Sequence, residues 1–214
     1  VRVLYPLLAF LMRRVLRIGP KTIDDERAAI EVVFERVAGL LADGRRYLDF
    51  LAGIAVVGLG HRHPAVTAAA HAQLDRLWHV SNLFWTLPML ELSERLSARL
   101  GGGQAFFCNS GAEANEGALK LARKATGRSR IVALEGGFHG RTLGALSATG
   151  QPGKWEGFGP LVPGVSFARP NDVESLEAAL APAGETALIL LEPVMGEGGV
   201  IPLEPAFAQA AAEL

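Results

Sequence analysis

The chain has 214 residues, of which half are apolar and a fifth are charged, and its formal net charge is −1. This length allows one large domain or a domain and a half, and the composition is ordinary for a soluble globular protein. The small net charge gives no indication of a nucleic-acid or other polyanionic partner.

The compartment is indicated by the single cysteine, Cys108, and by the first residues. One cysteine cannot form an internal disulfide, so a reducing cytosol is the default, and we expect Cys108 to be a small buried core residue. The apolar run from Val3 to Met12 is too short to span a bilayer, and it lacks the charge order and cleavage site of a signal peptide. The sequence therefore predicts a cytoplasmic protein with no membrane partner.

We expect the chain to divide into an N-terminal segment, residues 1–60, and part of a larger domain, residues 61–214. Residues 1–30 follow no recognisable pattern, whereas 31–60 are hairpin-like because Asp43-Gly44 is a turn signal between apolar pairs. Apolar spacing then predicts helices over Pro64–Trp78 and Thr86–Leu100, the second ended by three glycines.

From residue 104 onward, short apolar runs alternate with helical patterns. The predicted strands are Gln104–Cys108, Arg130–Leu134, Val165–Ala168 and Thr186–Leu191, and the predicted helices are Gly111–Ala125, Val173–Leu180 and Pro205–Leu214. On the first of these helices, we expect Ala114, Ala118, Leu121 and Ala122 to face inward. The alternation predicts an α/β fold with a mostly parallel sheet flanked by helices.

The first candidate for ligand chemistry is Ser110, which follows a predicted strand and opens a helix. The free amides and positive dipole of a helix N-terminus suit a phosphate, and Gly111 lets the backbone approach a ligand closely. Ser110 and Glu113 also form an S-x-x-E capping box, which needs no ligand. The local pattern leaves both interpretations open.

Two further stretches follow predicted strands, where parallel sheets bind their ligands. In Phe138-His139-Gly140-Arg141, the aromatic ring can stack on a flat heterocycle and the guanidinium can bind a carboxylate. Glu192 and Glu197 could orient polar groups or screen an arginine. The alternatives are a loop with a buried phenylalanine and a solvated arginine, and an exposed turn at residues 196–199.

A histidine pair and a lysine pair are weaker candidates for a functional site. His61 and His63 have no further ligand at useful spacing, so no metal is expected. Lys120 and Lys124 lie on the polar side of the helix after Gly111, and we interpret both as surface lysines, not as Schiff-base nucleophiles.

Taken together, three stretches and their spacing are similar to those of one enzyme family. They are Asn109-Ser110-Gly111-Ala112-Glu113-Ala114-Asn115, Phe138-His139-Gly140-Arg141-Thr142 and Glu192-Pro193-Val194-Met195-Gly196-Glu197-Gly198-Gly199, preceded by Asp43–Val56, Leu59–Pro64 and Ser81-Asn82-Leu83. In this order they resemble the class III aminotransferases, a branch of the fold-type I enzymes that use pyridoxal 5'-phosphate (PLP). Within that family they are most similar to the acetylornithine and succinylornithine aminotransferases, over roughly four fifths of the chain.

The resemblance implies a role for each matching residue. Ser110, Gly111 and Ala112 would bind the cofactor phosphate, and Phe138 would stack on the pyridine ring. Arg141 would bind a substrate carboxylate. Glu197 resembles the glutamate that, in relatives, pairs with a downstream arginine and helps the site take two amino acids in turn. Met195 departs from the glutamine common there.

The implied reaction is ping-pong transamination of N-acetylornithine or succinylornithine with 2-oxoglutarate, giving the semialdehyde and glutamate, by a cytoplasmic homodimer of arginine biosynthesis. The family's Schiff-base lysine would lie beyond Leu214, so we expect no catalytic residue of that kind in this chain. We expect the chain to form part of the large domain and to be inactive alone. The alternatives are another class III aminotransferase, specific for 4-aminobutyrate, ornithine or a lysine-pathway substrate, and a non-catalytic fragment.

Overall fold

The computed structural model describes residues 54, 56, 58, 59 and 62–214. The predicted hairpin at Asp43-Gly44 and most of the expected N-terminal segment lie outside the described residues, so that division of the chain stays a prediction. The chain splits into two units, residues 1–92 and 93–214, and each is described by itself.

The first unit contains helix α4 (Pro64–Leu74), the short 3-10 helix η1 (Ser81–Leu83) and the start of α5 (Leu87–Arg99). The predicted helix over 64–78 begins at the proline expected in its first turn but ends four residues early. Beyond this end, the indole N–H of Trp78 donates to the carbonyl oxygen of Leu74, the acceptor that the Trp78 amide would use if the helix continued.

The second unit is built on a parallel sheet in the order β2-β1-β3. Its strands are β1 (Arg130–Leu134), β2 (Val165–Ala168) and β3 (Thr186–Ile189), and a separate antiparallel pair is formed by β4 (Val194–Met195) and β5 (Ile201–Pro202). Its helices are α6 (Gly111–Thr126), α7 (Leu143–Ala148), η2 (Pro152–Lys154), α8 (Val173–Leu180) and α9 (Pro205–Glu213). The α/β fold with a parallel sheet flanked by helices is confirmed.

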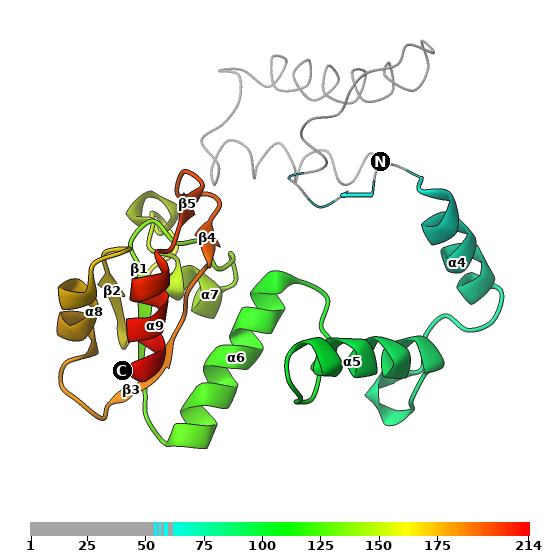
Figure 1. Ribbon diagram of the computed structural model, residues 1–214, viewed down its shortest axis with the longest axis horizontal. Coiled ribbons are helices and arrows are strands. Elements are labelled where there is room, and N and C mark those ends of the chain that lie inside the picture. Colours follow the sequence, from blue (N-terminus) through cyan, green and yellow to red (C-terminus); the bar gives the residue numbers. More distant parts are fainter. Residues whose placement is uncertain (1–53, 55, 57, 60–61) are drawn as a thin grey trace, which may run out of the picture. The chain divides into compact units, whose positions relative to one another are not determined.

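Helices cover both faces of this sheet, with α6 and α7 on one side and α8 and α9 on the other (Figure 1). On the α8–α9 side, Val132 and Leu134 of β1 pack in one cluster with Leu176 and Phe207. Ile131 and Ala133, which alternate with them along β1, are also buried. Such burial on both faces explains why β1 is a continuous apolar run instead of an alternating one.

One predicted strand is absent: residues 104–108 form no regular structure. A strand needs a neighbour to pair with its backbone, and no described strand pairs with this segment. Phe106 is 74% exposed. Its ring lies near Gly117 of α6, where an added methyl group would be 3.3 Å from a ring carbon. Cys108 is exposed too, so the expectation that it is a buried core residue is wrong.

The inward face of α6 also differs from the prediction. Leu121 is 68% exposed and Ala114 is exposed, whereas Leu119 is buried. The helix turns Asn115 and Glu116 toward the neighbouring loops, where both side chains form hydrogen bonds. Apolar spacing cannot reveal an inward face that is partly polar.

No helix in the described part of the chain is long and apolar enough to cross a membrane.

Candidate functional site

The N-terminus of α6 begins with a capped turn. The Ser110 hydroxyl oxygen accepts a hydrogen bond from the Glu113 amide at 3.2 Å, so the expected cap is present. Glu113 completes it by accepting from the backbone and side-chain N–H groups of Asn109, at 2.7 and 3.0 Å. In an α-helix the amides of Gly111 and Ala112 have no intrahelical acceptor. A methyl group placed on Gly111 would meet no atom within 4 Å outside the adjoining turn of the helix, so there is open space beside this residue.

The loop after β1 packs directly on this helix terminus. Gly140 has a φ of +134°, and a methyl group there would lie 2.7 Å from the Cβ of Ala112. The side chain of Asn115 donates to the His139 carbonyl oxygen at 2.6 Å. These contacts bring the phosphate-binding candidates of α6 and the Phe138 loop together, although 20 or more residues separate them in the chain.

Glu192 joins the loops that follow neighbouring strands β1 and β3. Its carboxylate accepts from the Phe138 amide at 2.6 Å and from the Gly196 amide at 3.4 Å. The expectation that Glu192 orients polar groups is confirmed by these bonds. Because the carboxyl ends of parallel strands lie at one edge, this carboxylate fixes the aromatic residue and the glycine-rich turn to the same edge.

Arg141 is exposed, with its guanidinium carbon 6.0 Å from the centre of the Phe138 ring. Its chain position is set from α6: Glu116 accepts hydrogen bonds from the Thr142 hydroxyl at 2.6 Å and from the Gly144 amide at 2.9 Å. Helix α7 is therefore capped by a side chain from another helix. Such a cap leaves no local sequence signal, and the sequence analysis missed both α7 and the role of Glu116.

A further charged group, Lys154, joins the site from η2. The Lys154 ammonium forms an ion pair with Glu197 at 2.9 Å and lies 5.0 Å from the centre of the Phe138 ring. The ring thus has two cationic neighbours, Lys154 and Arg141. The sequence analysis did not single out Lys154, which follows a Pro152-Gly153 turn and shows no periodic or motif signal.

His139, in the loop after β1, is almost wholly buried, with 6% of its surface exposed. Its amide donates to the Thr149 hydroxyl at 3.0 Å. Burial lowers the pKa of the imidazole, and the Glu192 carboxylate opposes part of that shift. The Nε2 atom of His139 has no hydrogen-bond partner among the residues that the structure describes.

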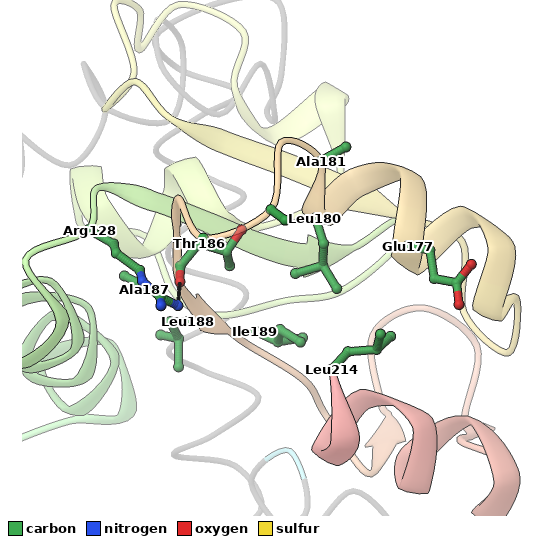
Figure 2. Close-up of a pocket in the computed structure, with 11 residues that line it drawn as sticks. Arg128, Glu177, Leu180, Ala181, Thr186, Ala187, Leu188, Ile189 and Leu214 are labelled. Carbon is green, nitrogen blue, oxygen red and sulfur yellow. Dashed lines mark hydrogen bonds between the residues drawn. The ribbon is translucent and has the colours of Figure 1, made fainter.

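A separate cavity of about 430 Å³ lies beside β3 and the segment that leads into it (Figure 2). Its walls come from β3, the end of α8 and Leu214, and most of them are apolar. Arg128 also lines the cavity, and its guanidinium donates a hydrogen bond to the Thr186 carbonyl oxygen at 3.2 Å. This cavity lies at the amino end of the strand, away from the edge where parallel sheets bind ligands, and we do not assign the site to it.

Comparison with known proteins identifies the family. The family described as "Aminotransferase class-III" matches residues 24–214. The chain is 53% identical over 171 residues to an acetylornithine aminotransferase of Streptomyces coelicolor, covering 79% of this chain and 42% of that protein. It is 49% identical to the acetylornithine aminotransferase of Bacillus subtilis, covering 78% and 43%.

Solved structures show the same likeness. The ornithine aminotransferase of Toxoplasma gondii superposes with a TM-score of 0.74 at 32% identity, over 80% of this chain and 42% of that one. An (S)-enantioselective omega-transaminase of Thermomicrobium roseum gives 0.74 at 33% identity, over 80% and 45%. The chain spans less than half the length of these four relatives. Its matched residues include every residue of the site described above, and the chain belongs to the class III aminotransferases.

Proposed function

We propose that this chain supplies the cofactor-phosphate and ring-binding half of a PLP-dependent aminotransferase acting on N-acetylornithine, or on succinylornithine, with 2-oxoglutarate as the acceptor. The observation that carries the proposal is the docking of the Phe138 loop on the first turn of α6 through Gly140 and Asn115. These contacts hold the loop that carries Phe138 against the first turn of α6. The acetylornithine aminotransferases at 49–53% identity support this choice of amino donor.

The residues fit the cofactor by their chemistry. Ser110, Gly111 and Ala112 would hold a phosphate, because the helix N-terminus offers free amides and Gly111 has open space beside it. Phe138, held at its amide by Glu192, would lie against the flat ring. When bound, PLP would supply the electron sink for the amino transfer.

The substrate side would be formed by charged groups around Phe138. Arg141 is exposed and free to turn toward a ligand, so it would bind a substrate carboxylate through its two-pronged guanidinium. Glu197 is held by Lys154 at the same ring and would take part in distinguishing the two substrates. We include in the proposal the cytosolic homodimer that the family resemblance implies.

Covalent attachment of PLP is not expected at the lysines that the structure describes. Lys120 and Lys124 are exposed on α6, and the amine of Lys154 is paired with Glu197. An unactivated, protonated amine is a poor nucleophile for an aldehyde. We therefore expect this polypeptide by itself to bind PLP without catalysing transfer.

The test combines absorbance spectra with chemical trapping. PLP is added to the purified chain, borohydride is added, and the lysines are examined by mass spectrometry. We expect reversible binding with no adduct at a single lysine. A specific adduct at Lys120, Lys124 or Lys154 would contradict the inactive-half proposal.

The donor is tested separately, on the product of the whole gene that encodes this chain. N-acetylornithine, succinylornithine, ornithine and 4-aminobutyrate are compared by kcat/KM with 2-oxoglutarate as acceptor. We expect one of the first two to be preferred. Preference for ornithine or 4-aminobutyrate would assign another class III activity, and no transfer with any donor would favour a non-catalytic protein.

A further inference from the structure

The segment that follows α7 runs along the loop after β1, which carries Phe138. The Gly150 carbonyl oxygen accepts a hydrogen bond from the Gly136 amide at 2.7 Å. A methyl group on Gly150 would overlap the Leu134 carbonyl oxygen, so no larger residue allows this approach. Glycine at this position therefore lets the two segments touch, and it brings the residues on either side of it onto the Phe138 loop.

The side chain of Gln151 holds the start of that loop. Its amide nitrogen donates to the carbonyl oxygens of Gly136 at 3.0 Å and Gly137 at 3.4 Å. These two glycines immediately precede Phe138, and they have no side chains of their own that could fix the backbone by packing. A half-buried side-chain amide therefore supplies contacts that a neighbouring strand supplies in a regular sheet.

The side chain of Thr149 holds the end of the same loop. This residue is fully buried, and its hydroxyl oxygen accepts a hydrogen bond from the His139 amide at 3.0 Å. The hydroxyl can donate to the Gly140 carbonyl oxygen at 3.3 Å or to a carbonyl oxygen of α7 at 3.0 Å. Because His139 and Gly140 immediately follow Phe138, the aromatic residue is held on both sides.

The result is a fixed backbone beneath a ring that stays partly open. Every residue from 136 to 140 has a backbone hydrogen bond, whereas Phe138 itself is only half-buried. A group that is already held in its binding position loses little conformational entropy when a ligand arrives. The bonds from residues 149 and 151 therefore favour binding at the ring.

We propose that Thr149 and Gln151 are positioning residues that hold Phe138 in place for a flat heterocyclic ligand. Both act through the backbone of the loop. That the ligand is the cofactor ring rests on the proposed function. The phosphate would be bound by α6, so loss of either hydrogen-bonding group should weaken binding of the ring and spare binding of the phosphate.

The test compares two ligands that share a phosphate but differ in the ring. Pyridoxine 5'-phosphate has the ring and lacks the aldehyde that reacts with lysines, and inorganic phosphate has no ring. The fluorescence anisotropy of pyridoxine 5'-phosphate gives its Kd for the full chain. Its displacement by inorganic phosphate gives the Kd of the second ligand.

The variants remove or keep one hydrogen-bonding group each. Gln151→Met has a similar length and no charge, but it has no N–H donor. Thr149→Val removes the hydroxyl, and Thr149→Ser keeps it. Gln209→Met is the matched control, because the Gln209 side chain donates to Glu213 at 2.9 Å on the exposed side of α9.

We expect Gln151→Met and Thr149→Val each to weaken binding of pyridoxine 5'-phosphate about fivefold, the effect of one lost hydrogen bond. The Kd of inorganic phosphate should change by less than about twofold in both variants. Thr149→Ser and Gln209→Met should match the wild type for both ligands. A general loss of folded protein weakens both ligands equally, so the ratio of the two Kd values separates positioning from a merely structural role.

A second measurement needs no ligand. Hydrogen exchange at the amides of residues 136–140 should be faster in Gln151→Met and Thr149→Val than in the wild type, and unchanged in Gln209→Met. If the buried Thr149→Val variant does not fold, the half-buried Gln151→Met variant decides the comparison.

Equal weakening of the two ligands, an unchanged ratio of their Kd values, or unchanged exchange would overturn the proposal. The proposed function fails in a different way. If the wild type binds pyridoxine 5'-phosphate no more tightly than inorganic phosphate, but exchange is faster in the variants, only the proposed cofactor is contradicted. A preference for the ring in the wild type that persists in the variants contradicts only the role of Thr149 and Gln151.

Discussion

Ser110 has one observed role, capping α6, and one proposed role, binding the cofactor phosphate, and the two can be separated experimentally. Its hydroxyl oxygen caps α6 by accepting from the Glu113 amide, and its position beside Gly111 suits a phosphate ligand. An aspartate at this position can keep the cap, because a carboxylate oxygen accepts the same hydrogen bond. The carboxylate, however, repels a phosphate.

Ser110→Asp should therefore retain the free energy of unfolding and lose most PLP affinity. Ser110→Ala, which removes the cap, should lower the free energy of unfolding by about 1 kcal/mol. Urea unfolding and PLP titration by absorbance measure the two effects. If the aspartate variant still binds PLP as the wild type does, the phosphate is not held at this helix terminus.

His139 is the buried titratable group of the site, and it makes stability depend on pH. Its pKa is lowered by burial, so in the range between the folded-state pKa and the ordinary value of about 6.5 the unfolded chain binds more protons. Stability therefore rises with pH through this range and is lost as pH falls below about 6.5.

We expect the wild-type chain to lose stability between pH 7.5 and pH 5.5 more steeply than His139→Gln, which cannot titrate. Urea midpoints at five pH values measure the difference. Parallel pH dependence of the two proteins would mean that the imidazole does not become harder to protonate on folding.

At the scale of elements, the site depends on close contact between the Phe138 loop and α6. Gly140 permits this contact because it has a positive φ and no side chain. A methyl group there would press on the Cβ of Ala112, at 2.7 Å, and on that of Ala145, at 3.0 Å. The helix and the loop would have to separate.

Gly140→Ala should cost about 1–3 kcal/mol of stability from overpacking alone, and PLP affinity should fall because the ring and the helix terminus move apart. Gly153→Ala is the matched control, since nothing lies within 4 Å of its added methyl group. Chemical unfolding and PLP titration of both variants provide the comparison. Similar behaviour of the two variants would show that the contact is looser than described.

Glu192 ties together the loops after β1 and β3, and we expect its loss to free both. Glu192→Ala should cost about 1.5–3 kcal/mol, the usual effect of removing a charged hydrogen-bond acceptor. Glu177→Ala removes an exposed carboxylate from α8 and should change stability by much less. Hydrogen exchange of the Phe138 amide reports the local effect, and unchanged protection in Glu192→Ala would contradict the anchor.

Much of this unit could be predicted from the sequence because its elements carry local signals. β1, β2 and α8 have their predicted bounds, since each is a short apolar or amphipathic run between strong turn residues. The segment 104–108 shows the limit of that reasoning. Its apolar residues favour a strand, but a strand also needs a partner, and pairing is not encoded in the segment itself.

The candidate site shows the same limit. Ser110, Phe138 and Glu192 could be predicted because each follows or precedes an element with a clear pattern. Lys154 and Glu116 could not, because their roles depend on segments more than 25 residues away. Contacts of this kind appear only when the chain is folded.

At the scale of the whole molecule, the second unit has apolar surface without a described partner. Leu121 of α6 and Phe106 are 68% and 74% exposed, and β3 pairs on only one side with a described strand. Exposed strand edges and apolar patches promote association. We expect the isolated chain to self-associate at micromolar concentration.

Leu121→Glu should reduce this association without lowering the free energy of unfolding, because the side chain has little buried surface to lose. Light scattering as a function of concentration measures the association, and Leu119→Glu, at a buried position, is expected to unfold the chain instead. A wild-type chain that stays monomeric and melts cooperatively would contradict the expectation.

Glu116 has a consequence for how this chain can change over evolutionary time. It lies on the same helix as Gly111 and fixes the segment that follows Arg141. Each helical residue turns the chain by about 100°, so one residue inserted between 111 and 116 would swing the carboxylate away from Thr142. An insertion in the exposed stretch 156–160 would disturb neither end of the helix. The first turn of α6 and the segment after Arg141 are therefore held at a fixed spacing by the helix. We expect replacements of side chains to be tolerated here more readily than changes in the length of this turn.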